Sequence, residues 1–118
     1  MKKVLIVDDA LESRVTIKKL LSLYNFQILE ASDGLEGWKL IVKEKPDLIL
    51  LDLYMPNKDG FEILKELKEE WLDIPVIILS GDHSLNTIEA CLGYGASAFV
   101  AKPLIKEDFN NAIKTLCA

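Results

Sequence analysis

Five short apolar runs divide the chain into units of similar length. These runs are rich in Val, Ile, Leu and Phe, and they span Val4–Val7, Phe26–Leu29, Leu48–Leu51, Pro75–Leu79 and Ala98–Ala101. Most of them do not alternate between apolar and polar residues, which is typical of strands covered on both faces in a parallel sheet. The pattern therefore predicts five buried, parallel strands.

The stretches between these runs have the periodicity of amphipathic helices. Apolar residues recur at helical spacing in three of them: Ile17, Leu20, Leu21 and Tyr24 in the first; Leu64, Leu67 and Trp71 in the third; Phe109, Ile113 and Leu116 in the last. A helix thus follows each strand, and this alternation predicts a right-handed, doubly wound α/β sandwich with five strand–helix units.

Several residues mark where the predicted helices begin and end. Asp33 with Glu36, and Asp59 with Glu62, have the spacing of a capping box, with Asp in place of the usual Ser or Thr. Gly95 is placed to end the fourth helix in a left-handed turn.

The functional crevice of such a sheet lies outside the carboxyl ends of its strands, at the switch point of strand order. The residues at the five strand ends are Asp8 with Asp9, Glu30, Asp52, Ser80 and Lys102. Three of these four carboxylates, the hydroxyl and the ammonium can therefore meet at one edge of the sheet.

The adjacent acids Asp8 and Asp9 need an explanation, because repulsion and partial desolvation both oppose two like charges at a strand end. A divalent cation would remove the conflict, and oxygen ligands select Mg²⁺ or another hard ion. The sequence offers no set of Cys and His residues with the spacing of a zinc site. His83, the sole histidine, is expected to be a solvated loop residue.

A carboxylate beside a cation, a lysine and a hydroxyl describes a site for phosphoryl transfer. Asp52 is the best candidate nucleophile, because it stands alone at the end of the central strand. Lys102 would neutralise charge on the phosphoryl oxygens, and Ser80 would donate a hydrogen bond. Each of these residues alone has an ordinary interpretation as a cap, turn or surface residue, but their joint occurrence at strand ends favours a site.

Length and composition exclude several other classes. The 118 residues suffice for one domain, expected to span residues 1–118, and half of them are hydrophobic. The net charge of −5 argues against nucleic-acid binding through a basic face. Apolar runs are too short for a membrane span, and the N-terminus is interpreted as a strand. Cys91 and Cys117 are expected to be reduced packing residues of a cytoplasmic protein.

Four motifs occur in order: "VDD" ending at Asp9, "LLDLYMPNKDG" (Leu50–Gly60), "ILSG" (Ile78–Gly81) and "GYGASAFVAKP" (Gly93–Pro103). With them, nearly the whole chain closely resembles the receiver domain of bacterial two-component response regulators, in the form of the single-domain chemotaxis regulator. The resemblance implies a flavodoxin-like sandwich with strand order 2-1-3-4-5.

The resemblance also implies a phosphoacceptor and its metal. Asp52 would accept a phosphoryl group from a phosphohistidine on a sensor histidine kinase or histidine phosphotransfer protein. Asp9 and Asp52 would ligate Mg²⁺ directly together with the main-chain carbonyl of Tyr54, while Asp8 would act through water. Mn²⁺ would be able to replace Mg²⁺ at this site.

The same resemblance implies a switch. Lys102 would pair with Asp52 and, once Asp52 is phosphorylated, with the phosphoryl group. The peptide bond between Lys102 and Pro103 would be cis. Ser80 would bond a phosphoryl oxygen, and Phe99 occupies the aromatic switch position, where Tyr is commoner. Tyr94 departs from the small residue usual before "GA". The face of the fourth helix, fifth strand and fifth helix would bind a downstream target or output domain, or a second copy of the chain.

Two residues are expected to set the lifetime of the phosphoryl group. Tyr54 and Asp82 stand two residues past Asp52 and Ser80, where they would flank the path of attacking water. Asp82 could pair with Lys102 or orient water, and both residues could instead be solvated loop residues with no kinetic role.

Two other function classes fit the sequence less well. A metal-dependent hydrolase with a phosphoaspartate intermediate usually carries a second Asp where this chain has Tyr54. A flavin-binding domain needs a Gly- and hydroxyl-rich loop where this chain has the acidic segment "DDALESR". Whether the chain is a stand-alone regulator or part of a longer protein stays open.

Overall fold

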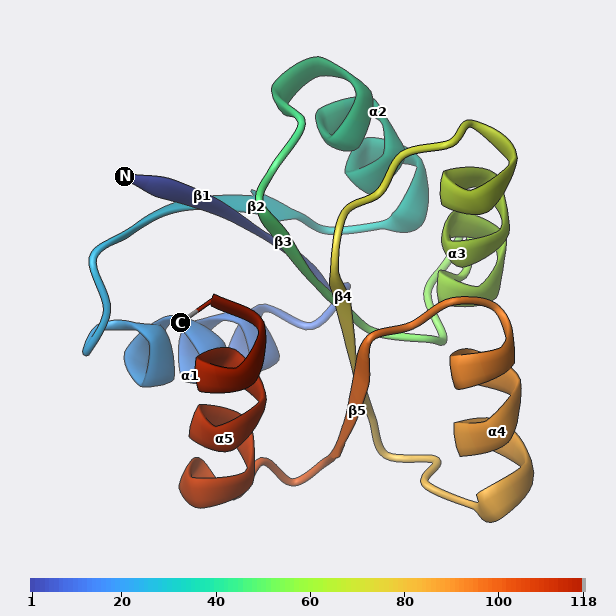
Figure 1. Cartoon of the computed structure of the whole chain (residues 1–118). Coiled ribbons are helices and arrows are strands. Elements are labelled where there is room, and N and C mark those ends of the chain that lie inside the picture. The colour runs from blue at the N-terminus through green and yellow to red at the C-terminus, as the bar shows by residue number, and fades with distance from the viewer. Residues whose placement is uncertain (118) are drawn as a thin grey trace.

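Strands and helices alternate along the chain in the computed structural model, which describes residues 1–117. The strands are β1 (Lys2–Val7), β2 (Phe26–Ala31), β3 (Leu48–Leu51), β4 (Val76–Ser80) and β5 (Ala98–Ala101). The helices are α1 (Leu11–Leu21), α2 (Gly34–Glu44), α3 (Gly60–Glu69), α4 (Leu85–Gly93) and α5 (Lys106–Cys117) (Figure 1). The predicted strands are confirmed, although β1 and β2 are each two residues longer than expected, and β4 starts and ends one residue later.

The five strands form one parallel sheet in the order β2-β1-β3-β4-β5. Helices α1 and α5 cover one face of this sheet, while α2, α3 and α4 cover the other (Figure 1). The doubly wound, flavodoxin-like architecture predicted for the chain is therefore confirmed.

The sheet is apolar on both faces because each face carries its own core. Leu5 and Val7 of β1 pack in the cluster beneath α2, α3 and α4, whereas Val4 and Ile6 pack in the cluster beneath α1 and α5. All four side chains are fully buried. This double burial explains why the strand sequences show no polar alternation.

The predicted capping boxes form fully at one helix and partly at another. At α3, the Asp59 carboxylate accepts from the Glu62 N–H at 2.9 Å, and the Glu62 carboxylate accepts from the Asp59 N–H at 3.1 Å. At α2, Asp33 accepts from the Glu36 N–H, but the carboxylate of Glu36 bonds the N–H of Ser32 instead. The reciprocal half of that box is therefore displaced by one residue.

Helix α3 ends earlier than its apolar spacing predicted. The helix stops at Glu69, and Trp71 lies beyond it with φ +57° and a 92% exposed side chain. The N–H of Trp71 donates to the Lys68 carbonyl, and that of Leu72 donates to the Leu67 carbonyl, which is the Schellman pattern. Placing Trp71 on the buried helix face was wrong; Leu72 instead turns back onto the core.

The end of α4 has the same hydrogen-bond pattern and confirms the role predicted for Gly95, whose φ is +101°. Gly95 donates to the Leu92 carbonyl and Ala96 to the Cys91 carbonyl. Cys91 is buried and its thiol is free, as expected. The side chain of Cys117 lies outside the described residues, so the expectation for it stays a prediction.

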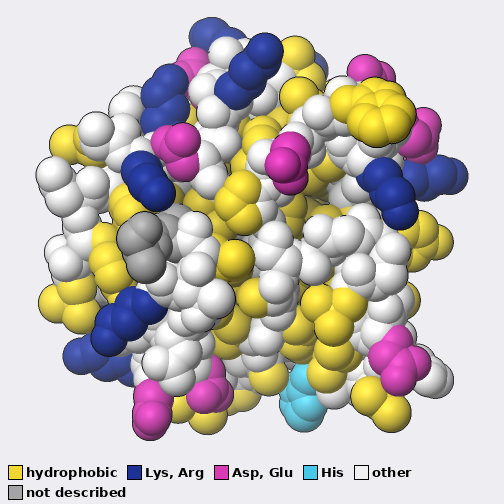
Figure 2. Space-filling view, viewed as in Figure 1, with side chains coloured by type: hydrophobic (Ala, Val, Ile, Leu, Met, Phe, Trp, Pro, Cys, Tyr) yellow, Lys and Arg dark blue, Asp and Glu magenta, His cyan; other side chains and the backbone are white. Residues whose placement is uncertain are grey.

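The surface seen in Figure 2 carries Lys and Arg side chains interspersed with Asp and Glu rather than one basic patch. His83 lies exposed in the β4–α4 loop, as predicted. Within residues 1–117, no helix has both the length and the apolar character needed to cross a membrane.

Replacing Trp71 with Gly is expected to stabilise the fold. An L-residue in the left-handed region is strained, and this side chain has almost no contacts to lose. We expect Trp71→Gly to raise the free energy of unfolding by about 0.5–1 kcal/mol after the greater unfolded-state entropy of Gly is included. Trp71→Ala keeps the Cβ and serves as the control. Urea denaturation followed by circular dichroism measures both variants, and equal stability of the two would contradict this account.

Candidate functional site

The ends of β1 and β3 bring three carboxylates together. Asp8 and Asp9 follow β1, and Asp52 follows β3, which is paired with β1 in the sheet. Carboxylate oxygens of the three residues lie within 4.8 Å of one another. Asp8 is buried, Asp52 is partly buried and Asp9 is exposed, so the cluster opens to solvent on the side of Asp9.

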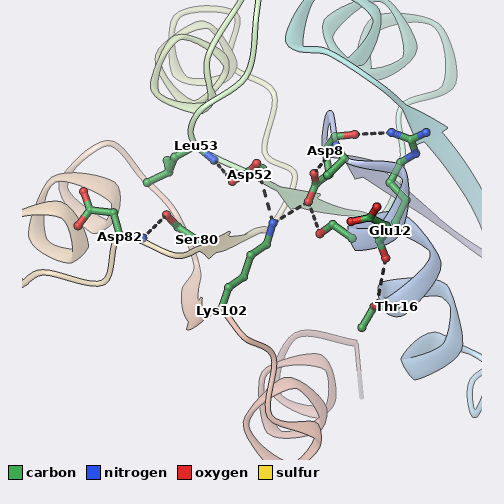
Figure 3. Close-up of polar contacts among 11 residues, drawn as sticks. Asp8, Glu12, Thr16, Asp52, Leu53, Ser80, Asp82 and Lys102 are labelled. Carbon is green, nitrogen blue, oxygen red and sulfur yellow. Dashed lines mark hydrogen bonds and ion pairs between the residues drawn. The ribbon is translucent and has the colours of Figure 1, made fainter.

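Asp8 is held by donors on several sides (Figure 3). Its Oδ1 accepts from the Ala10 N–H at 2.9 Å, and its Oδ2 accepts from the Ser13 hydroxyl at 2.6 Å. Ala10 is the N-cap of α1 and has no capping side chain of its own. The carboxylate of Asp8 therefore lies at the N-terminus of α1, where the partial positive charge of the helix stabilises an anion.

Lys102, which follows β5, reaches across the site to two of the carboxylates (Figure 3). Its Nζ lies 2.8 Å from Asp8 Oδ2 and 3.9 Å from Asp52 Oδ2. The resemblance implied a pair with Asp52, but the shorter contact is with Asp8. The peptide bond between Lys102 and Pro103 is cis, as predicted.

Ser80 is the last residue of β4, and it is almost completely buried. Its hydroxyl oxygen accepts from the Asp82 N–H at 3.1 Å, and its carbonyl accepts from the Lys102 N–H at 2.9 Å. Phe99, in the neighbouring strand β5, is half-buried and packs against the core beneath α2, α3 and α4.

Tyr54 and Asp82, which follow Asp52 and Ser80 by two residues, are joined to each other by a hydrogen bond. The hydroxyl of Tyr54 donates to Asp82 Oδ2 at 3.0 Å, and the Thr87 hydroxyl donates to the same atom at 2.8 Å. Bonds from Thr87, from the Ser84 N–H and from Tyr54 lower the pKa of Asp82. These groups, rather than Lys102, are the partners of Asp82.

Glu30 does not join the acid cluster. It lies within β2, and its carboxylate accepts from Arg14 Nε at 3.1 Å and from Lys18 Nζ at 3.0 Å. The hydrogen bond from Lys18 is the main reason that the pKa of Glu30 is lowered, and Arg14 adds to it. Taking Glu30 as the residue at the end of its strand was wrong, because β2 continues to Ala31.

Three residues around the acids were missed by the sequence reasoning. Ser13 and Arg14 both contact Asp8, the latter through a bond from Nη1 to the Asp8 carbonyl at 2.6 Å. Their only sequence signal is their place in the first turn of the helix after the acid pair. Gly60 starts α3, where a Cβ would lie 2.6 Å from the Asp52 carbonyl oxygen, so a larger residue would push the Asp52 backbone away.

Burial and crowding make Asp52 unusually hard to ionise. Desolvation raises the pKa of Asp52 from 3.8 to about 6, and the charges of Asp8 and Asp9 act in the same direction. The ammonium of Lys102 and the Leu53 N–H, which bonds Asp52 Oδ1 at 2.9 Å, oppose the rise only in part (Figure 3).

The donor set of this cluster fits a hard divalent cation. Asp8, Asp9 and Asp52 offer carboxylate oxygens and no soft ligands, and Mg²⁺ is usually bound by one or two carboxylates plus waters. The exposed side of the cluster leaves room for such waters.

Comparison with known proteins identifies the family. The family model for the response regulator receiver domain matches residues 4–114. The chain belongs to this family. This receiver domain is 35% identical over 113 residues to sporulation initiation phosphotransferase F of Bacillus subtilis, covering 96% of this chain and 91% of that protein.

Other relatives agree with this assignment. The probable C4-dicarboxylate response regulator DctR of Bacillus subtilis is 35% identical over 114 residues, which are 96% of this chain and 50% of that protein. The solved receiver domain of the Francisella response regulator 1452 has a TM-score of 0.91 and 30% identity, covering 98% of this chain and 96% of that chain. This receiver domain thus spans nearly all of the first relative but only half of the second.

Asp52→Asn is expected to stabilise the receiver domain at neutral pH when no divalent cation is present. Because the folded pKa of about 6 exceeds the ordinary 3.8, wild-type stability falls as pH rises from about 4 to above 6. Removing the charge should add on the order of 1–3 kcal/mol at pH 7.5 and less than about 1 kcal/mol at pH 4. The measurement is urea denaturation with chelator across this pH range.

The control for that measurement is Asp73→Asn, which removes a carboxylate from an exposed loop. Its stability difference from wild type should not depend on pH in this way. A gain for Asp52→Asn that is independent of pH would contradict the raised pKa.

Proposed function

We propose that this receiver domain accepts a phosphoryl group on Asp52 from a phosphohistidine of a sensor histidine kinase or a histidine phosphotransfer protein. The observation that carries the proposal is the position of Asp52. Asp52 directly follows β3, and its carboxylate lies beside two further carboxylates, with the Lys102 ammonium 3.9 Å away. The domain would act as a phosphoacceptor module of the cytoplasm that assists its own phosphorylation and dephosphorylation.

In the transfer step, a carboxylate oxygen of Asp52 attacks phosphorus as the bond between phosphorus and the imidazole nitrogen breaks. The electron pair of that bond stays on the histidine, and Asp52 becomes an acyl phosphate. Asp9, Asp52 and the Tyr54 carbonyl would hold Mg²⁺, with Asp8 acting through water. When bound, the metal neutralises charge on the transferred group.

Lys102 and Ser80 would stabilise the product. Phosphorylation adds about 1.5–2 negative charges and three acceptor oxygens. Lys102 already lies within reach of Asp52, so a small shift away from Asp8 would bring its ammonium to the phosphoryl group. The Ser80 hydroxyl, which bonds the Asp82 N–H, can rotate to donate to a phosphoryl oxygen.

The output of the switch would be the surface formed by α4, β5 and α5. A movement of Ser80 toward the phosphoryl group would leave space into which Phe99 can turn. Exposed apolar side chains on α4 and at its C-cap, Leu85 (69% exposed), Leu92 (48%) and Tyr94 (45%), support a contact with a downstream protein, an output domain or a second copy. We do not propose direct contact with nucleic acid or membrane.

A turnover hydrolase is the less favoured function. Tyr54, whose hydroxyl is engaged by Asp82, stands where such enzymes usually have an acid, and this hydrogen bond raises the pKa of Tyr54. A group that holds its proton so firmly is a poor general acid at neutral pH.

Treatment with acetyl phosphate and Mg²⁺ is expected to place one acid-labile, hydroxylamine-sensitive phosphoryl group on Asp52. Asp52→Asn should remove the adduct, because an amide oxygen is a poor nucleophile. Mass spectrometry after hydroxylamine trapping locates the modified residue. Asp73→Asn, which leaves the cluster intact, should be labelled like wild type, and a phosphoryl group at another residue of wild type would refute the assignment.

Tyr54→Asn is expected to shorten the phosphoryl half-life severalfold. The Tyr54 ring, held by Asp82, would cover the path of water attacking opposite the aspartyl oxygen, and a severalfold change needs only about 1 kcal/mol of barrier. Tyr54→Phe keeps the ring and loses the hydrogen bond, so its effect should be smaller. Loss of label from purified phosphoprotein in excess Mg²⁺ gives the rates; an unchanged or longer half-life in Tyr54→Asn rejects the shielding role.

A further inference from the structure

The guanidinium of Arg14 bridges Asp8, the first residue after β1, and Glu30 of β2. Arg14 lies in the first turns of α1, and its side chain is only 14% exposed. One nitrogen, Nη1, donates to the Asp8 carbonyl at 2.6 Å, and another, Nε, donates to Glu30 Oε1 at 3.1 Å. The planar fork of Arg suits two acceptors in fixed directions, which a single ammonium cannot match.

The carbonyl that Arg14 binds belongs to the peptide group between Asp8 and Asp9. The Asp8 N–H is already fixed by the Ala31 carbonyl at 3.1 Å, and the Asp8 carboxylate is fixed by the donors described above. What remains free to rotate in this segment is the peptide plane between Asp8 and Asp9. The hydrogen bond from Arg14 to the Asp8 carbonyl therefore fixes the orientation of that plane. Asp9 is exposed, so its direction depends on that backbone.

We propose that Arg14, held in place by Glu30, is a positioning residue that orients Asp9 for binding of the divalent cation. This inference rests on the proposed Mg²⁺ site at Asp8, Asp9 and Asp52. Arg14 would not touch the metal; it would act through the backbone of its ligand, as outer contacts of metal ligands commonly do.

Charge alone makes the opposite prediction. Arg14 carries a positive charge next to a site for a cation, so its removal should tighten cation binding if long-range electrostatics were its only influence. The positioning role requires weaker binding after the same change. The sign of the effect therefore separates the two explanations.

A variant of Lys18 distinguishes the positioning role of Arg14 from a purely structural role. Lys18 binds the other oxygen of the same Glu30 carboxylate at 3.0 Å, lies on the same helix, and has no hydrogen bond or ion pair to Asp8 within residues 1–117. Lys18→Met thus removes one positive charge and one bond to Glu30, as Arg14→Met does, but leaves the Asp8 carbonyl bonded.

The experiment measures Mn²⁺ binding to unphosphorylated, full-length chain by the electron paramagnetic resonance signal of free Mn²⁺, with Mg²⁺ as competitor. We expect Arg14→Met to weaken binding about tenfold, the lower end of effects seen for residues that orient metal ligands. Lys18→Met should stay within about twofold of wild type or bind slightly more tightly, as its lost charge would allow. Urea denaturation of each variant shows that it is folded under the binding conditions.

Two conservative variants complete the test, and they provide the result on their own if Arg14→Met does not fold. Arg14→Lys keeps the charge but can satisfy only one of the two acceptors, so binding should weaken severalfold. Glu30→Gln keeps an acceptor for Arg14 but removes the ion pair, and a smaller weakening is expected.

Each outcome has a definite meaning. Unchanged or tighter Mn²⁺ binding in folded Arg14→Met, or wild-type binding in Arg14→Lys, overturns the positioning role while leaving the proposed metal site intact. Equal weakening in Lys18→Met also overturns it, because Lys18 does not hold the peptide before Asp9. Failure of wild type itself to bind Mn²⁺ or Mg²⁺ overturns the proposed metal site and this inference together.

Discussion

Repulsion among three carboxylates is the constraint around which this edge of the molecule is arranged. Asp8, Asp9 and Asp52 have oxygens within 4.8 Å of one another, and burial makes the charge on Asp52 still more costly. Compensation comes from separate parts of the chain, since the N-terminus of α1 and the ammonium of Lys102 both meet Asp8. The cluster is therefore tolerable only because the fold brings cationic groups to it.

The parallel sheet is what prevents the carboxylates from moving apart. Strands β1 and β3 are neighbours whose paired residues, Val4–Val7 and Leu48–Leu51, are buried, and the Asp52 N–H still donates to the Val7 carbonyl at 2.9 Å after β3 has ended. On the other side of Asp52, its carbonyl oxygen packs closely against Gly60, where a Cβ would lie only 2.6 Å from that oxygen. Because the backbone is fixed on both sides of Asp52, its carboxylate stays near Asp8 and Asp9 despite their repulsion. A flexible loop would let the three carboxylates move apart.

The sequence was sufficient for the sheet and for most of the residues at the carboxyl ends of its strands, because both depend on strong local signals. Apolar runs indicate buried strands, and the carboxyl ends of the strands in a parallel sheet lie at the same edge. What failed depended on tertiary contacts without a local pattern. Trp71 has helical spacing although α3 has already ended, and Glu30 was predicted to lie at the end of its strand although β2 continues to Ala31. Arg14 could not be recognised, because its acceptor is a backbone carbonyl.

A short chain of hydrogen bonds links Ser80 to α4 and gives the proposed switch a physical route. The Ser80 hydroxyl accepts from the Asp82 N–H, and the Asp82 carboxylate in turn accepts from the Ser84 N–H and from the Thr87 hydroxyl. Ser84 caps α4, and Thr87 lies in its first turn. If Ser80 turned to a phosphoryl group on Asp52, the first bond to be lost would be the one that anchors this loop. Helix α4 would then be the first element to lose a constraint, because its cap lies only four residues beyond Ser80.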